Sequence, residues 1–145
     1  MLFYGEDTLI WFTSDQHWKH ANILQYCNRP FSGVDEMDAE MIGRWNVLVK
    51  PGDTVYHLGD FTLNGLDDFL AIKNQLNGQL KIVPGSHDHR WIKDFTGYWE
   101  GVELLPPLVS LEFEELGDGK HAQVIVLCHY PMLSWDRSFH GSWHL

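Results

Sequence analysis

Cysteine is scarce in this chain. Cys27 and Cys128 are the only two cysteines among 145 residues, and neither belongs to a C-x-x-C pair. Two cysteines cannot build the disulfide framework that holds small secreted domains together. We therefore expect both to be ordinary reduced thiols.

Basic residues and long apolar runs are also few. Lys and Arg number 10 against 20 Asp and Glu, which gives a formal net charge of -10. A chain this acidic gains no affinity from neutralising phosphates, so general binding to nucleic acid or to an anionic membrane is not expected. No apolar run approaches the roughly 20 residues that span a bilayer, and Glu6 and Asp7 stand where a secretory signal would carry Lys or Arg. The prediction is a cytoplasmic protein.

The sequence shows no sign of a second domain. It contains no internal repeat, no low-complexity segment and no linker rich in Pro, Gly and Ser. A domain of 145 residues can bury roughly two-thirds of its unfolded surface. We expect one domain over residues 1–145.

Histidine, by contrast, is abundant. The chain has 9, nearly as many as Lys and Arg together. Neutral imidazole is the commonest metal ligand in proteins, and it titrates near neutral pH. A single histidine is more often a surface or core residue than a ligand, so its position in the chain has to decide.

The order of strand and helix patterns predicts an α/β fold, with a hairpin following alternating strands and helices. The expected strands are 9–12, 53–58 and 80–83, and the expected helices between them are 35–49 and about 65–78. Ser32 or Asp35 is the expected N-cap of the first helix. Two later strand patterns, 108–113 and 123–128, flank the turn-forming segment 117–120, which is typical of an antiparallel hairpin.

Four of these strands give way at once to Asp or His. The strand ends read Asp15-x-His17, Gly59-Asp60, Gly85-Ser86-His87-Asp88 and Cys128-His129. A single Asp after a strand is more often a turn former than a ligand. Because ligands of α/β proteins bind beyond the carboxyl ends of the strands, four such ends in succession predict side chains that converge on one edge of the sheet.

Carboxylate oxygens and imidazole nitrogens without thiolate suit Mn, Fe, Zn or Ni better than Ca or a soft metal. The candidate ligands Asp15, His17, Asp60 and His129 offer this mixture. Two divalent cations about 3.5 to 4 Å apart would relieve the repulsion between converging carboxylates, activate a bridging water and clamp a phosphoryl group. The pattern therefore favours phosphoester chemistry.

The ordered set of motifs resembles the calcineurin-like metallophosphoesterase superfamily, whose pattern reads D-x-H, G-D, G-N-H-[DE], H and then G-H-x-H. The resemblance spans nearly the whole chain. The segments 15–20 and 28–31, which read DQHWKH and NRPF, are further similar to the small bacterial and phage members. The fold that this resemblance implies has two mixed β-sheets packed face to face and flanked by helices, in four α-β-β-α layers.

The resemblance also implies a role for each motif residue. Asp15 and His17 would bind one metal, Asp60 would bridge both, and Ser86 and His129 would belong to the second. A bridging hydroxide would be the nucleophile.

The resemblance places the general acid of the reaction in the motif 85–88. His87 would protonate the leaving oxygen, with Asp88 as its orienting partner. Histidine titrates in the range that this proton transfer requires.

The sequence departs from the family pattern at two places. Position 86 carries Ser where the family has Asn, and a hydroxyl on so short a side chain would need a loop shift or a water to reach the metal. The chain also ends at 141–145 (GSWHL) before any G-H-x-H, so it looks C-terminally truncated. Each metal would lose one imidazole, and we expect the second metal site to be weak.

Further residues receive expectations from their positions. His20 and His89 lie close to motif residues and are candidates for substrate binding, with polar surface as the alternative for His20. Arg29 is the best-placed guanidinium for a phosphate oxygen, and a structural salt bridge is equally open. His57, inside a strand, is expected to be buried and structural, and Trp18 to wall the pocket.

The leading interpretation is a metal-dependent phosphoesterase that hydrolyses a phosphodiester or a small phosphomonoester, with oligomer formation left open. The alternative is a catalytically weak binding scaffold of the same fold, which Ser86 and the missing terminal motif favour. The intact ligands, such as Asp15 and His129, oppose it. A mononuclear metal protein without phosphate chemistry would leave His87 and Asp88 unexplained.

Overall fold

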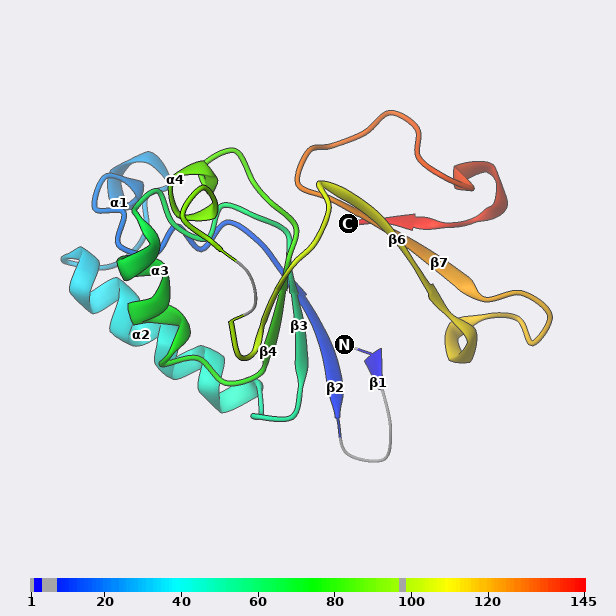
Figure 1. Ribbon diagram of the computed structural model, residues 1–145, viewed down its shortest axis with the longest axis horizontal. Coiled ribbons are helices and arrows are strands. Elements are labelled where there is room, and N and C mark those ends of the chain that lie inside the picture. The colour runs from blue at the N-terminus through cyan, green and yellow to red at the C-terminus, as the bar shows by residue number, and fades with distance from the viewer. Residues whose placement is uncertain (1, 4–7, 97–98) are drawn as a thin grey trace.

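The computed structural model describes residues 2–3, 8–96 and 99–145 and forms a mixed α/β structure with two sheets (Figure 1). The strands are β1 (Leu2–Phe3), β2 (Leu9–Thr13), β3 (Thr54–His57), β4 (Gln79–Ile82), β5 (Val102–Leu104), β6 (Leu108–Phe113), β7 (Gln123–Cys128) and β8 (Trp143–His144). The α-helices are α1 (Ile23–Tyr26), α2 (Val34–Leu48), α3 (Leu66–Lys73) and α4 (His89–Ile92), and two short 3-10 helices cover Glu114–Leu116 and Ser138–His140.

The larger sheet is mostly parallel. Its five strands lie in the order β1-β2-β3-β4-β5, and the pairs from β2 to β5 are parallel. Parallel strands need crossover connections, which α2 and α3 provide in this chain. The carboxyl ends of β2, β3 and β4 therefore meet at one edge of the sheet.

The helices cover one face of this sheet (Figure 1). Alternate strand residues such as Val55, Leu80 and Ile82 point toward them and are buried with the helix residues Phe69 and Trp91. The rings of Phe69 and Trp91 stack with their centroids 4.1 Å apart. Because successive strand side chains point to opposite faces, the neighbours of these residues are available for a second core.

The smaller sheet packs against the other face. Its order is β6-β7-β8, and Ile125 and Leu127 of β7 are buried with Tyr56 of β3 and with Val83, the residue that follows β4. The strands β6 and β7 are antiparallel, with Leu108 opposite Cys128 at one end of the pairing. Helices, large sheet and small sheet thus form successive layers.

Several sequence predictions are confirmed and others need correction. The hairpin has the predicted bounds, and α2 is shifted by one residue from the predicted helix. Its N-cap is Gly33 rather than Ser32 or Asp35, because the amide and hydroxyl of Ser32 donate to the Glu36 carboxylate instead of capping the helix. The helix expected to reach about 78 ends at Lys73.

Two further predictions are wrong, one about the environment of Trp18 and one about the sheet that carries the strand ends. Trp18 does not wall a pocket: it is 0% exposed and packs in the core beside Phe61, with the ring centroids 6.1 Å apart. The four strand ends also do not belong to one sheet, because β7, which precedes His129, is a strand of the smaller sheet.

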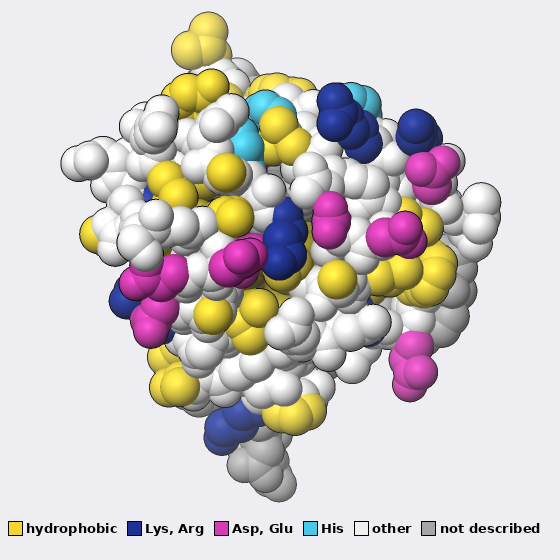
Figure 2. All heavy atoms as spheres, turned by 90° about the vertical axis from the view of Figure 1, so that its left-hand side faces the viewer, with side chains coloured by type: hydrophobic (Ala, Val, Ile, Leu, Met, Phe, Trp, Pro, Cys, Tyr) yellow, Lys and Arg dark blue, Asp and Glu magenta, His cyan; other side chains and the backbone are white. Residues whose placement is uncertain are grey.

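None of the helices in the described parts of the chain has the length and apolar character needed to cross a lipid bilayer. Figure 2 shows the helix-bearing side of the molecule, where basic and acidic side chains are interspersed and the visible histidines gather near the upper edge. The loops that follow the parallel strands lie at the same upper edge in Figure 1.

Candidate metal centre

The loops after β2 and β3 continue the pairing of their strands beyond the strand ends. Three backbone hydrogen bonds join them. They run from the amide of Asp15 to the carbonyl of Gly59 (3.0 Å), from His17 to Asp60 (3.1 Å) and from Trp18 to Phe61 (2.8 Å). The two motif-bearing loops are therefore held as one unit.

The backbone of these loops is curled tightly. Asp15, His17 and Asp60 have φ angles of 62°, 54° and 56°, a left-handed region that residues with a Cβ atom rarely adopt. Gly59, at φ 89°, comes so close to the third loop that a Cβ there would lie 2.4 Å from the amide nitrogen of Gly85. Backbone strain of this kind persists where surrounding contacts hold it and clusters at functional sites.

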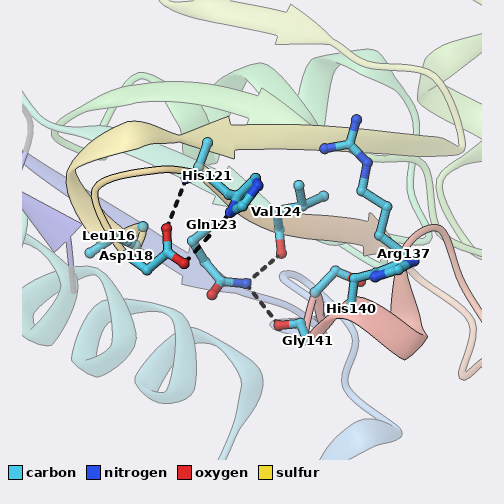
Figure 3. A pocket seen from close by; sticks show the side chains of 11 residues that line it. Leu116, Asp118, His121, Gln123, Val124, Arg137, His140 and Gly141 are labelled. Atoms are coloured by element: carbon cyan, nitrogen blue, oxygen red, sulfur yellow. Dashed lines mark hydrogen bonds and ion pairs between the residues drawn. The ribbon is translucent and has the colours of Figure 1, made fainter.

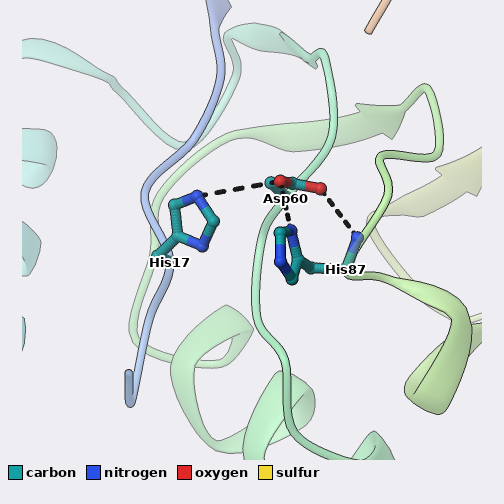
Figure 4. A group of neighbouring side chains, drawn as sticks. All are labelled: His17, Asp60 and His87. Carbon is teal, nitrogen blue, oxygen red and sulfur yellow. Dashed lines mark hydrogen bonds and ion pairs between the residues drawn. The ribbon is translucent and has the colours of Figure 1, made fainter. Parts of the chain in front are cut away.

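The carboxylate of Asp60 is the centre around which three histidines gather. It lies 3.7 Å from Nε2 of His17, 2.6 Å from Nδ1 of His87 and 3.5 Å from Nε2 of His129. Figure 4 shows His17, Asp60 and His87 pointing toward one another from three separate loops. His129 approaches from the smaller sheet, so the cluster draws on both sheets.

Two overlapping groups of side chains have the spacing of a metal site. His17, Asp60 and His87 form one, and Asp15, Asp60 and His129 form the other, with the ligand atoms of each group within 4.8 Å of one another. Asp60 belongs to both. The ligand atoms are oxygen and nitrogen, which suit Mn, Fe, Zn or Ni.

The hydrogen bonding of His129 fits a cation in particular. Its Nδ1 lies 2.8 Å from the carbonyl oxygen of Leu58 and must donate a proton to it, because that oxygen can only accept. In the neutral ring Nε2 then carries a lone pair, and this lone pair faces a carboxylate oxygen of Asp60 at 3.5 Å. A cation between the two acceptors would satisfy both, as in many metal sites where a carbonyl fixes the tautomer of a ligating histidine.

The charge states also suit metal ligation. Burial raises the pKa of Asp60, but hydrogen bonds from the amide and the ring of His87 outweigh it and hold the pKa below its ordinary value. Burial lowers the pKa of His17, although the Asp60 and Asp15 carboxylates act in the opposite direction. An ionised Asp60 and a neutral His17 are the forms that a metal requires.

Among the three histidines around Asp60, His87 is the most exposed, with 43% of its side chain accessible. Its Nδ1 lies 2.6 Å from Asp60 and 3.0 Å from the hydroxyl of Ser86. That hydroxyl is itself 3.2 Å from the nearer Asp60 oxygen. Ser86 therefore lies against the centre, where its hydroxyl contacts a ligand carboxylate.

The predicted pairing of Asp88 with His87 is wrong. Asp88 is 0% exposed, and its two carboxylate oxygens accept four hydrogen bonds from other groups. The donors are the amides of Asp60 (2.8 Å), Phe61 (2.9 Å) and Gly85 (2.8 Å) and the indole of Trp91 (2.9 Å). Asp88 therefore joins the loop after β3 to the loop after β4 and to α4. The position beside Nδ1 of His87, which was predicted for Asp88, is taken by Asp60.

The guanidinium of Arg29 binds the backbone of the first motif-bearing loop. Its guanidinium donates to the carbonyl oxygens of Asp15 at 2.8 Å and Gln16 at 2.6 Å. Within the described residues it has no acidic partner, so the alternative of a salt bridge is wrong. Its role in substrate binding stays a prediction that this geometry does not favour.

The other histidines surround the cluster. The ring of His20 lies 5.6 Å from that of His17, and burial lowers its pKa. His89 is exposed at the start of α4, with Nδ1 3.4 Å from the carbonyl of Ser86. His57 is fully buried as predicted, and burial lowers its pKa to about 4.

One residue that holds the site was missed in the sequence. Asp38 of α2 is buried, and its carboxylate accepts a hydrogen bond from the amide of Lys19 at 3.3 Å and lies 3.4 Å from the Lys19 ammonium. Burial raises its pKa despite these contacts. A carboxylate beside Met37 on the inward side of α2 was the available signal.

A separate hollow lies in the smaller sheet (Figure 3). It measures about 860 Å³ and is lined by the hairpin end and the C-terminal segment, with His121, Arg137 and His140 among its residues. None of the predicted site residues lines it. This hollow is therefore separate from the residues of the Asp60 cluster.

Comparison with known proteins finds relatives but no matching family model. An uncharacterized protein of Methanocaldococcus jannaschii is 44% identical over 81 residues, which cover 54% of this chain and 46% of that protein. The chain therefore spans less than half the length of this relative. A protein of unknown function from Aquifex aeolicus, known from a crystal structure, has a TM-score of 0.62 and 29% identity over 86% of this chain and 62% of its own.

Two phage proteins match most of the chain. The gene 66 protein of Mycobacterium phage D29 is 30% identical over 131 residues, covering 84% of this chain and 63% of that protein. The gene 66 protein of Mycobacterium phage L5 is 30% identical over 149 residues, covering 93% of this chain and 70% of that protein. On this similarity, the chain belongs to the family of the mycobacteriophage gene 66 proteins.

Proposed function

We propose that this protein is a metal-dependent phosphoesterase with the four-layer fold of the calcineurin-like metallophosphoesterases. The observation that carries the proposal is the sharing of Asp60 by two ligand groups, one with His17 and one with His129. A shared carboxylate is what a pair of metal ions close to each other requires. The order of the motifs along the chain supports the same assignment.

The residues that would hold two divalent ions are Asp15, His17, Asp60 and His129, with Asp60 between the two sites. Ions bound there would supply Lewis-acid activation of water and neutralise charge on a phosphate ester. The net charge of the chain is -10, and the cluster itself holds two carboxylates, so an anionic substrate has little reason to bind the metal-free site.

His87 has the position of the proton donor. Asp60 holds its Nδ1, which leaves Nε2 as the ring atom that can face a substrate. Its partial exposure allows contact with a leaving oxygen, whereas His17 and Asp60 are buried. His20 and His89 lie at the rim, where they can contact the remaining phosphate oxygens or the leaving group.

The test combines metal binding with hydrolysis. Protein freed of metal is titrated with Mn²⁺, and the rate of bis(4-nitrophenyl) phosphate hydrolysis is followed in the same samples. We expect activity that depends on Mn²⁺ and that falls by at least about 100-fold in Asp60→Asn, with the bound Mn²⁺ lost in parallel. Asp94→Asn, which changes an exposed carboxylate outside the cluster, is the matched control and should behave like the wild type.

Two results would contradict the proposal. Binding of Mn²⁺ without hydrolysis of this diester or of 4-nitrophenyl phosphate would indicate a metal-binding scaffold. Hydrolysis that Asp60→Asn leaves intact would place the reaction outside the cluster.

A further inference from the structure

We propose that Arg29 is the positioning residue of the metal-binding loop 15–17 and that it does not bind the substrate phosphate. This inference rests on the metal site proposed above. It concerns how the chain holds Asp15 and His17 in place, which the motif residues themselves do not explain.

The first observation is the fork that the Arg29 side chain makes. One terminal nitrogen donates to the carbonyl oxygen of Asp15 at 2.8 Å and the other to that of Gln16 at 2.6 Å. The planar guanidinium can bridge two acceptors rigidly, which the single ammonium of lysine cannot do. The same nitrogen that contacts Gln16 lies 3.3 Å from the sulfur of Met37, so the guanidinium also contacts α2.

The second observation is the strain of the loop that Arg29 contacts. Asp15, His17 and Lys19 have φ angles of 62°, 54° and 62°, and none of them is glycine. Non-glycine residues favour negative φ angles, so the loop needs contacts that hold its backbone in this conformation. Arg29 binds the backbone directly before His17, and Asp38 binds the amide of Lys19.

The third observation links Arg29 to the centre itself. The peptide unit between Gln16 and His17 is hydrogen-bonded at both ends: its carbonyl accepts from Arg29, and its amide donates to the carbonyl of Asp60 at 3.1 Å. Arg29 thus acts through one peptide unit on two candidate ligands, His17 and Asp60. Outer contacts of this type set the orientation of metal ligands.

The sign of the charge makes this role testable. A guanidinium close to a cation site repels the cation, so removal of its charge alone would strengthen metal binding. A positioning role gives the opposite result, because the ligands are no longer held together. A phosphate-binding role gives a third result, in which metal affinity is unchanged and the KM for substrate rises.

The experiment uses the full chain with Arg29→Ala, Arg29→Lys and the control Arg44→Ala, which removes an exposed arginine of α2. Calorimetry on metal-free protein gives the affinity for Mn²⁺. Amide hydrogen exchange without metal reports on the His17 and Trp18 amides, and thermal unfolding verifies that each variant folds. Steady-state kinetics at saturating Mn²⁺ separate kcat from KM.

We expect Arg29→Ala to bind Mn²⁺ about 10- to 100-fold more weakly and to exchange the His17 and Trp18 amides faster, with KM unchanged at saturating metal. Arg29→Lys, which can hold one carbonyl, should recover part of both losses, and Arg44→Ala should match the wild type. Equal or tighter Mn²⁺ binding by Arg29→Ala, or a rise in KM alone, would overturn the inference and leave the proposed function standing. A wild-type chain that binds no Mn²⁺ would overturn both, whatever the exchange rates.

Discussion

The Nδ1 atom of His87 lies 2.6 Å from the Oδ2 atom of Asp60, the carboxylate that both candidate metal groups share. This contact connects two residues with different proposed roles. His87 is the expected proton donor, and Asp60 is the expected ligand of both metals. It also fixes which ring nitrogen of His87 is available to a substrate, because Nδ1 is engaged.

The first prediction concerns His87 as a proton donor. His87→Ala should lower the turnover of a substrate with a poor alkoxide leaving group by about 100- to 10,000-fold, the usual loss when a proton donor is removed. The loss should be far smaller for bis(4-nitrophenyl) phosphate, since nitrophenolate leaves without protonation.

Metal content, measured by elemental analysis after dialysis, decides between donor and ligand for His87. We expect it to stay at the wild-type level. Equal losses on both substrates together with loss of metal would show that His87 is a ligand, as its place in one of the two groups allows.

The second prediction concerns the buried carboxylate of Asp88. Each carboxylate oxygen of Asp88 accepts two N–H hydrogen bonds. Asp88→Asn replaces one of these oxygens by an NH₂ group, so two hydrogen bonds are lost and the NH₂ group faces two other N–H donors. Urea unfolding of the metal-free protein should show a loss of about 2 to 4 kcal/mol in the free energy of unfolding. Asp94→Asn is the control, and a loss no larger than that of the control would show that Asp88 does not hold the loops.

The third prediction concerns pH and His57. Burial lowers the pKa of His57 to about 4, whereas in the unfolded chain its pKa is near 6.5. Between these values the unfolded state binds more protons, so acid favours unfolding. The stabilisation is complete above about pH 6.5 and is lost as the pH falls toward 4.

Urea unfolding at pH 7 and pH 5 measures this effect. The wild type should lose stability over this interval with a slope of up to about 1.4 kcal/mol per pH unit from His57. His57→Gln should reduce the slope, whereas His121→Gln, which changes an exposed histidine, should not. Identical slopes in wild type and His57→Gln would contradict the assignment.

The fourth prediction concerns Ser86, whose hydroxyl lies 3.2 Å from Asp60. An amide oxygen extends further from the backbone and is a stronger ligand, so Ser86→Asn should tighten the weaker of two Mn²⁺ sites in a calorimetric titration. Ser86→Ala is the matched control and should leave that site weak. No gain in Ser86→Asn would mean that this position does not contribute to metal binding.

The fold and the site could be predicted from the sequence to different depths. Short apolar runs that end in Asp or His are local signals, and they located Asp15, Asp60 and His87 correctly at the strand ends. The sequence did not show that His129 follows a strand of a separate sheet, because the packing of the β6–β7 hairpin against the larger sheet depends on contacts between distant segments. Short elements such as α1 and α4 carry too few residues for a periodic pattern.

The roles of Arg29 and Asp88 show the same limit. The resemblance implies that Asp88 orients His87, and the position of Arg29 suggests contact with a phosphate oxygen or a structural salt bridge. In the structure both bind the backbone, since curled loops leave amides and carbonyls without partners in a strand or helix. These unpaired amides and carbonyls result from positive φ angles at non-glycine residues, and the sequence does not show which non-glycine residues adopt such angles.

The most direct test of the central claim is a crystal of the full chain grown with Mn²⁺ and examined by anomalous scattering. We expect a Mn²⁺ peak that lies within about 2.6 Å of a carboxylate oxygen of Asp60 and also contacts His17 or His129. Asp60→Asn should show no such peak. A map in which Mn²⁺ is absent from Asp60 but bound elsewhere on the protein would contradict it.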